Sequence, residues 1–154
     1  GHIGRAVAKV AAQVDFAIIV CDDRAEIFAA ESFPEGSSLK TSVPEAVEEL
    51  TRWSGDQYVT LVTRSFMHDI AACESLHKIS SLKYVGLMGS QRRVAGVLAA
   101  CREKGFEKFP IDVLHAPVGI EINAETPEEI AVSIVAEMIR HRRRETRTAH
   151  SQSL

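Results

Sequence analysis

Gly1-His2-Ile3-Gly4 opens the chain and runs directly into Arg5-Ala6-Val7-Ala8-Lys9-Val10-Ala11-Ala12, a stretch of small and apolar residues typical of a packed helix. We interpret residues 1–4 as the second half of a G-x-G-x-x-G turn. In such a turn Gly1 would let the backbone approach a pyrophosphate, and Gly4 would let the helix pack closely on a sheet. The first glycine and the strand that feeds the turn would then precede residue 1. Alone the motif is weak, because a tight contact between helix and strand needs the same glycines without any ligand.

The next segment strengthens this interpretation. Phe16-Ala17-Ile18-Ile19-Val20-Cys21 is an apolar run typical of a buried strand, and it ends in Asp22 and Asp23. These carboxylates follow the glycine turn at about the twenty-residue distance at which a dinucleotide-binding unit places its ribose-binding acid. A helix, a buried strand and an acidic end together predict a nucleotide-like ligand at this corner, with His2 beside the turn.

Composition excludes several classes of protein. The 154 residues are 45% hydrophobic and 25% charged, with a net charge of -3, which fits one globular domain. This charge gives no reason to expect a nucleic-acid partner, and no apolar stretch reaches the about 18 residues of a membrane span. Cys21, Cys73 and Cys101 form no zinc pattern, so we expect no metal site and interpret each as a small buried hydrophobe in a cytoplasmic protein.

Residues 57–63 are rich in β-branched and aromatic side chains and predict a buried parallel strand that ends at Thr63. Open α/β sheets bind their ligands at the carboxyl ends of such strands. His68 and Asp69 then open a helix. A capping or surface role for His68 is as well supported as catalysis, and Asp69 is first of all a residue of the helix N-terminus.

A second strand, residues 83–88, ends in Gly89 and Ser90 and leads into a helix that stops at Gly105. Ser90 is well placed to cap this helix, whose free backbone N–H groups could receive an anion together with Arg92 and Arg93. An ordinary capped helix with solvent-facing arginines fits the local pattern equally well.

The remaining elements are shorter or less regular. The sequence predicts a short helix over 24–31, an edge strand over 39–41, a helix from 43 capped by Ser42, an irregular linker over 106–116 and a loop over 117–124 that contains Gly119. Thr126, Pro127 and Glu129 form a capping box that begins a core helix. Residues 146–154 are expected to be a disordered polar tail.

These elements predict an α/β fold: a Rossmann-like, doubly wound, mostly parallel sheet in three α/β/α layers, over residues 1–145. Its first strand would be missing or truncated. Because that strand lies in the middle of such a sheet, its absence would leave two half-sheets with unpaired edges at the ligand crevice. We therefore expect either a fragment, poorly stable in isolation, or a slot that another chain fills.

Two longer stretches add a family resemblance. Residues 84–93 (YVGLMGSQRR) and 116–134 (APVGIEINAETPEEIAVSI), with residues 1–4 and 22–24, resemble the C-terminal Rossmann-like domain of the XdhC/CoxI family, and the resemblance covers residues 1–139. It implies a maturation factor, not a turnover enzyme, that binds the molybdenum cofactor and assists its sulfuration and insertion into xanthine dehydrogenase or a related molybdenum hydroxylase. A cysteine desulfurase as further partner and a homodimer are also expected.

The chain departs from the family pattern at two positions. Family members often carry a histidine soon after the strand-end threonine, where this chain has Arg64, and Asn123 stands where glycine is common. Asparagine tolerates the left-handed backbone region, so the second change is benign. The first leaves the role of that loop in cofactor chemistry open.

The cofactor-binding candidates are ten residues at the predicted strand ends and helix starts: Gly1, His2, Gly4, Asp22, Asp23, Thr63, Gly89, Ser90, Arg92 and Gly119. The phosphate of molybdopterin, or its dinucleotide form, would suit the glycine turn and the Ser90 helix start. An NAD(P)-binding oxidoreductase fits the turn and Asp22 equally well but lacks a plausible base, since Tyr58 and Tyr84 lie inside strands and His68 is the only candidate near the crevice. A nucleotide-sensing domain is a third alternative. No Ser-His-Asp order is visible along the chain.

Overall fold

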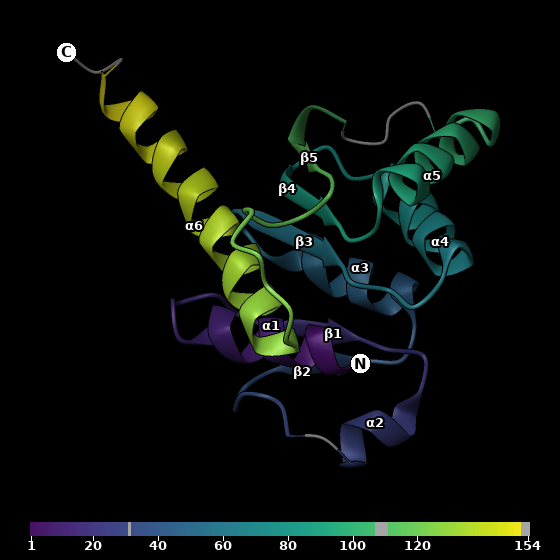
Figure 1. Ribbon diagram of the computed structural model, residues 1–154, viewed down its shortest axis with the longest axis horizontal. Coiled ribbons are helices and arrows are strands. Elements are labelled where there is room, and N and C mark those ends of the chain that lie inside the picture. The colour runs from purple at the N-terminus through teal and green to yellow at the C-terminus, as the bar shows by residue number, and fades with distance from the viewer. Residues whose placement is uncertain (31, 107–110, 152–154) are drawn as a thin grey trace.

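The chain folds into parallel strands covered by helices on both faces (Figure 1). The computed structural model describes residues 1–30, 32–106 and 111–151. Its elements, in chain order, are α1 (His2–Ala12), β1 (Ile19–Cys21), α2 (Ala25–Ala30), β2 (Ser38–Lys40), α3 (Val43–Arg52), β3 (Gln57–Leu61), α4 (Phe66–Leu76), β4 (Leu82–Leu87), α5 (Gln91–Glu103), the 3₁₀ turn η1 (Ile111–Val113), β5 (Leu114–His115) and α6 (Pro127–Ser151). This α/β architecture confirms the predicted fold class.

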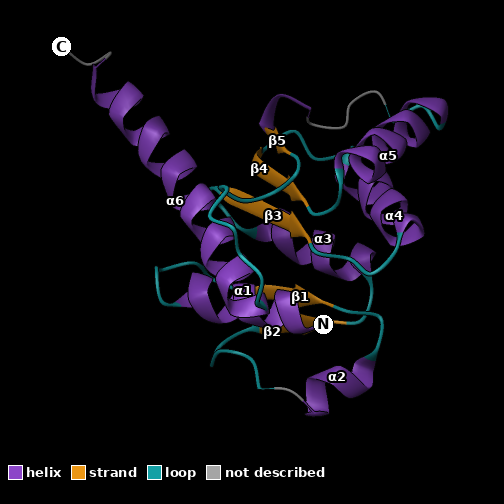
Figure 2. Cartoon of the chain, in the orientation of Figure 1, coloured by secondary structure: helices purple, strands orange, loops and turns teal. Residues whose placement is uncertain are grey.

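The strands of the described chain form two parallel sheets. β1 pairs with β2, and β3, β4 and β5 form a second sheet in that order (Figure 2). The division into two half-sheets agrees with the expectation from the sequence. The arrows of β1 and β3 in Figure 2 point toward the same side of the molecule, where β1 delivers Asp22 and β3 delivers Thr63.

The two faces of β4 belong to two separate cores, because successive side chains of a strand point to opposite faces. Val85 and Leu87 pack in a cluster with residues of α4 and α5, among them the buried thiols of Cys73 and Cys101. Tyr84 packs in the other cluster, with α1 and α6. Helices on both faces of the sheet give the expected three layers.

Aromatic rings fill the space between α6 and the sheet. The ring of Tyr84 is stacked on that of Tyr58 at 5.6 Å and on that of His115 at 4.4 Å between centroids, and His141 of α6 meets all three edge-on. The Tyr84 hydroxyl donates to Glu137, which is buried on α6. Burial, and then this hydrogen bond, raise the pKa of Tyr84.

Three predictions about individual segments were wrong. The linker over 106–116 contains β5, whose Leu114 pairs with Val85; two residues are too few for a strand pattern to show in the sequence. Helix α6 continues to Ser151, so residues 146–151 of the expected tail are helical, while 152–154 lie outside the described residues. Cys21 is exposed rather than buried, because it ends β1 at the rim of the sheet.

None of the helices in the described ranges combines the length and the apolar character needed to cross a membrane.

Candidate functional site

The N-terminus of α1 forms the first part of the site. Gly1 precedes the helix without a side-chain cap, so the first-turn amides of α1 have no hydroxyl or carboxylate of the helix start to accept from them. Gly4 lies close to β3: a Cβ added there would be 3.4 Å from Cγ2 of Val62. This confirms the predicted packing role of Gly4, and His2 lies exposed on the first turn.

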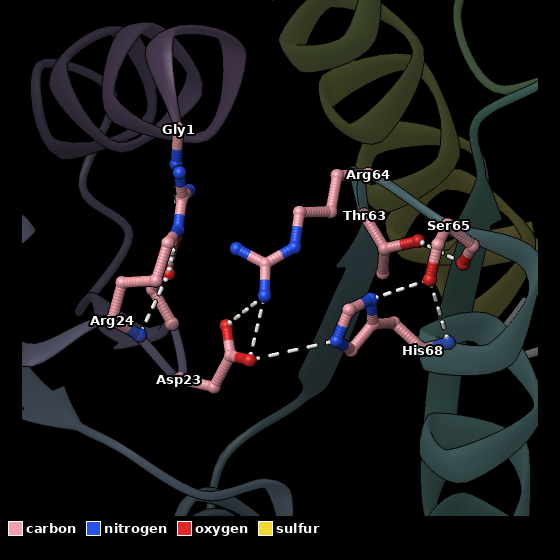
Figure 3. Close-up of polar contacts among 8 residues, drawn as sticks. Gly1, Asp23, Arg24, Thr63, Arg64, Ser65 and His68 are labelled. Carbon is pink, nitrogen blue, oxygen red and sulfur yellow. Dashed lines mark hydrogen bonds and ion pairs between the residues drawn. The ribbon is translucent and has the colours of Figure 1, made fainter.

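Asp22 lies beside this helix start, and the acceptor positions of its carboxylate are all used by hydrogen bonds within the chain. Its carboxylate accepts four hydrogen bonds, from the Arg24 backbone N–H (3.1 Å), Nε (3.0 Å) and Nη2 (2.9 Å) and from the Gly1 nitrogen (3.0 Å). A carboxylate offers about four acceptor positions, so none is left for a ribose diol. The neighbouring guanidinium of Arg24 instead faces Gly1, where a built Cβ would lie 3.7 Å from Nη2 (Figure 3).

These contacts also control the protonation of Asp22. Burial raises the pKa of the Asp22 carboxyl, but the hydrogen bonds from the Arg24 side chain and backbone outweigh it and hold the pKa well below the ordinary value of 3.8.

The lowered pKa makes Asp22 a source of acid-sensitive stability. A group with a depressed pKa in the folded state stabilises the fold above its unfolded pKa, and this contribution is lost as the pH falls through the folded pKa. We expect the free energy of unfolding to fall as the pH drops below about 4, and Asp22→Asn to remove part of this dependence. Denaturant titrations from pH 6 downward measure it, with the exposed Asp56→Asn as control; equal pH slopes in wild type and Asp22→Asn would contradict the assignment.

Asp23 connects the end of β1 to the start of α4. Arg64 Nη2 donates to both of its carboxylate oxygens, at 2.9 and 2.7 Å, and His68 Nε2 lies 3.5 Å from Asp23 Oδ2. The Ser65 hydroxyl lies 2.6 Å from His68 Nδ1 and also accepts the His68 backbone N–H, which makes Ser65 the N-cap of α4. Figure 3 shows these side chains in one row, with the imidazole between serine and carboxylate.

A buried clamp joins β3 to the starts of α4 and α5. Asp69 is 0% exposed; it accepts from Arg93 Nε at 2.8 Å and Nη2 at 2.6 Å and from the Thr63 hydroxyl. Arg93 Nη2 also donates to Thr63 Oγ1 at 3.0 Å. The clamp therefore fixes Thr63, a predicted site residue, through two residues that the predicted site did not include.

The start of α5 is organised largely as predicted. Ser90 caps the helix by accepting the Arg93 backbone N–H at 3.3 Å. Gly89 has a φ of +149°, and Arg93 folds over it, with its Cδ 2.9 Å from where a Cβ would be. Arg92 is exposed and has no hydrogen bond or ion pair within the described part of the chain. Of these two neighbouring arginines, Arg93 is the one that contacts residues at the end of β3 and the start of α4.

Gly119 is placed by packing against α6. Its N–H donates to Glu137 Oε2 at 2.9 Å, its φ is +99°, and a Cβ there would be 2.5 Å from Ser133 Oγ. Ser133 in turn donates to the carbonyl of Ile120. The Gly119 amide already donates to Glu137 and is not available to a ligand. Glycine is required here by the positive φ and by the close approach of the loop to Ser133.

The contacts form one continuous edge. Gly4 meets Val62 beside β3, Asp23 pairs with Arg64, and Arg93 reaches from α5 back to Thr63. The glycine corner and the Ser90 helix start therefore share the carboxyl-end side of the sheets, as a common ligand crevice requires. Within the described ranges, no group of three or more His, Cys, Asp or Glu residues could hold a metal ion.

Sequence reasoning missed the pairings that hold this edge together. Arg24, Arg64 and Arg93 each pair with a carboxylate at a strand end or helix start. The available signal was an arginine within a few residues of the ends of β1, β3 and β4. Partner choice across 41 and 24 positions could not be deduced without the fold.

Comparison with known proteins identifies relatives along nearly the whole chain. An uncharacterized protein of Escherichia coli (strain K12), YqeB, is 39% identical over 141 residues, covering 90% of this chain and 25% of its own length. A probable subunit of xanthine dehydrogenase from Bacillus subtilis (strain 168) is 34% identical over 138 residues, covering 90% and 39%. This chain thus spans less than half the length of either relative.

A solved structure agrees with the fold. The crystal structure described as a xanthine dehydrogenase from Bacillus halodurans matches with a TM-score of 0.78 at 28% identity, over 97% of this chain and 44% of that one. The sequence model of the XdhC Rossmann domain matches residues 1–138. The chain therefore belongs to the XdhC family, as its Rossmann domain.

Proposed function

We propose that this domain binds the molybdenum cofactor through its phosphate and serves as a maturation factor for xanthine dehydrogenase or a related molybdenum hydroxylase. The relatives whose names refer to xanthine dehydrogenase support the choice of target. A homodimer and a cysteine desulfurase partner belong to the same proposal and rest on the family resemblance alone.

The observation that carries the proposal is the start of α1. Its first-turn amides lack a side-chain cap, whereas α3, α4 and α5 are each capped by a serine. Arg24 lies against this start and keeps N–H groups of its guanidinium beyond those given to Asp22. Uncapped amides and a guanidinium together suit a phosphate, so the residues present fit the phosphorylated end of the cofactor.

The role we assign to the chain is binding and orientation. When bound, the cofactor supplies the molybdenum-centred redox chemistry that the target hydroxylase uses. Cys21 is an exposed residue near this corner. Partial burial of its thiol, and then the negative charges of Asp22, Asp23 and Glu45, raise the pKa of that thiol. A thiol with a raised pKa is a poor nucleophile, which favours sulfur delivery by a partner over a persulfide on this chain.

The NAD(P)-binding alternative is less well supported. It depends on a carboxylate at the end of β1 that reads the ribose diol. Asp22 occupies that position with all its acceptor capacity already used by Arg24 and Gly1.

Cofactor retention tests the proposal. The chain would be purified from a host that makes the molybdenum cofactor, and bound pterin quantified as its fluorescent oxidation product. We expect wild type to retain pterin, and Arg24→Ala to lose about tenfold in affinity, since a charge-assisted contact of about 1.4 kcal/mol is removed. Arg52→Ala, on the exposed Arg52–Glu48 pair of α3, is the control and should bind as wild type. Absence of pterin, together with saturable NADH binding, would replace the proposal by the oxidoreductase.

A further inference from the structure

Ser65, His68 and Asp23 form a row of side chains that plays no part in the proposed phosphate contacts of the cofactor. Its three polar groups are those of a nucleophile, a base and an orienting carboxylate, with Ser65 Oγ 2.6 Å from His68 Nδ1 and His68 Nε2 3.5 Å from Asp23 Oδ2. The serine and histidine come from the start of α4 and the aspartate from the end of β1 (Figure 3). The sequence hides this grouping because the aspartate lies far from the other two along the chain.

In the tautomer with Nδ1 of His68 unprotonated, the Ser65 hydroxyl donates its proton to this nitrogen across the 2.6 Å contact. Nε2 then carries the imidazole proton and faces Asp23. When Nδ1 takes the serine proton, the carboxylate stabilises the imidazolium, which is the division of roles in serine hydrolases. Arg64 holds both oxygens of Asp23 and so fixes the carboxylate facing His68.

The chain contains two further serine caps that serve as internal comparisons. Ser42 accepts the backbone N–H of Glu45, and Ser90 accepts that of Arg93, as Ser65 does for His68. Among the three serine caps of the described residues, Ser65 alone has a hydroxyl that is also hydrogen-bonded to the side chain at the third helical position. Capping alone would not require this contact.

The surroundings of Ser65 supply the remaining parts of an acyl-transfer site. Phe66 and Met67 begin α4, where backbone N–H groups lack carbonyl partners within the helix and can donate to a developing oxyanion. The side chains of His68 and Asp23 are 41% and 54% exposed, so a small ester can reach the row from solvent.

We propose that Ser65 is an activated nucleophile that hydrolyses small carboxylic esters, with His68 as general base and Asp23 as its orienting partner. Ser65 Oγ forms a bond to the carbonyl carbon while its proton passes to His68 Nδ1. The ester C–O bond then breaks, and the leaving alcohol takes that proton. Water then attacks the acyl carbon and gives a proton to His68. The bond from that carbon to Ser65 Oγ breaks, His68 returns the proton to Oγ, and the carboxylic acid leaves.

Covalent labelling with a fluorophosphonate tests the nucleophile directly. Ser65 Oγ would form a bond to phosphorus, fluoride would leave, and the serine proton would pass through His68 to solvent. Peptide mass spectrometry of the labelled 154-residue chain should locate the adduct on Ser65 and not on Ser42 or Ser90. Hydrolysis of p-nitrophenyl acetate should be lost from the labelled protein.

Two sets of variants separate chemistry from folding. Ser65→Asp keeps a good N-cap but has no nucleophile, so labelling and hydrolysis should vanish while the far-UV dichroism stays that of wild type. His68→Asn should slow labelling about 100-fold, the usual contribution of a general base, and Asp23→Asn at least about tenfold. Ser42→Ala removes an equivalent cap outside the row and should label as wild type.

Labelling spread equally over the three capping serines, or unchanged by His68→Asn, would overturn the proposal and leave Ser65 as a cap only. The cofactor experiment with Arg24→Ala is independent of this result, because Arg24 takes no part in the row.

Discussion

Replacing Asp69 with alanine is expected to lower the free energy of unfolding by about 3 to 5 kcal/mol. The carboxylate is 0% exposed and accepts from Arg93 and from the Thr63 hydroxyl, so its removal leaves a guanidinium at the helix starts without its counter-charge. Arg93 is 27% exposed, and partial hydration should keep the loss near the lower figure. Urea titration followed by far-UV dichroism measures the change.

A double variant shows whether the unpaired charge is the cause. Asp69→Ala with Arg93→Met removes both members of the pair, and we expect it to be more stable than Asp69→Ala alone. Glu48→Ala, which breaks the exposed pair with Arg52, should leave the midpoint nearly unchanged. If the double variant were less stable than the single one, packing of the Arg93 stem, not charge, would explain the effect.

Gly119→Ala should produce the second large loss, about 2 to 6 kcal/mol. The φ of +99° is strained for any residue with a Cβ, and that atom would lie 2.5 Å from Ser133 Oγ. Backbone strain contributes about 1 to 3 kcal/mol and overpacking a similar amount. Thermal unfolding of the variant, compared with wild type, gives the magnitude.

Controls divide this loss into its two parts. Ser133→Ala removes the clashing oxygen, so Gly119→Ala should cost less in that background, and the remainder measures the backbone strain. Gly55→Ala is the matched control, because no atom lies within 4 Å of a Cβ there. Equal losses at Gly119 and Gly55 would contradict the close packing of the loop on α6.

The sequence predicted well those parts of the fold that depend on local chemistry. The caps at Ser42, Ser90 and Thr126 and the strand over 57–63 follow from hydrogen-bonding groups and periodicity within a few residues. β5 and the long C-terminal helix were missed because one is only two residues long and the other continues through polar residues that carry no stop signal.

Strand ends and helix starts could be assigned from the sequence pattern, but the contacts that join them could not. The carboxylates were expected to await a ligand, whereas Asp22, Asp23 and Asp69 are each paired with an arginine. Pairing of this kind depends on distances between strands, which no single segment encodes.

The stacked pair of Tyr58 and Tyr84 and the exposed Trp53 give the protein two independent optical reporters of unfolding. These are the only two tyrosines of the chain, and their rings are held face to face beneath α6, an arrangement that produces a strong near-ultraviolet dichroism band. The single tryptophan, Trp53, is 51% exposed at the end of α3, so its emission reports on a different region. Coincident loss of the tyrosine band and shift of the tryptophan emission would show that the two halves of the domain unfold as one cooperative unit.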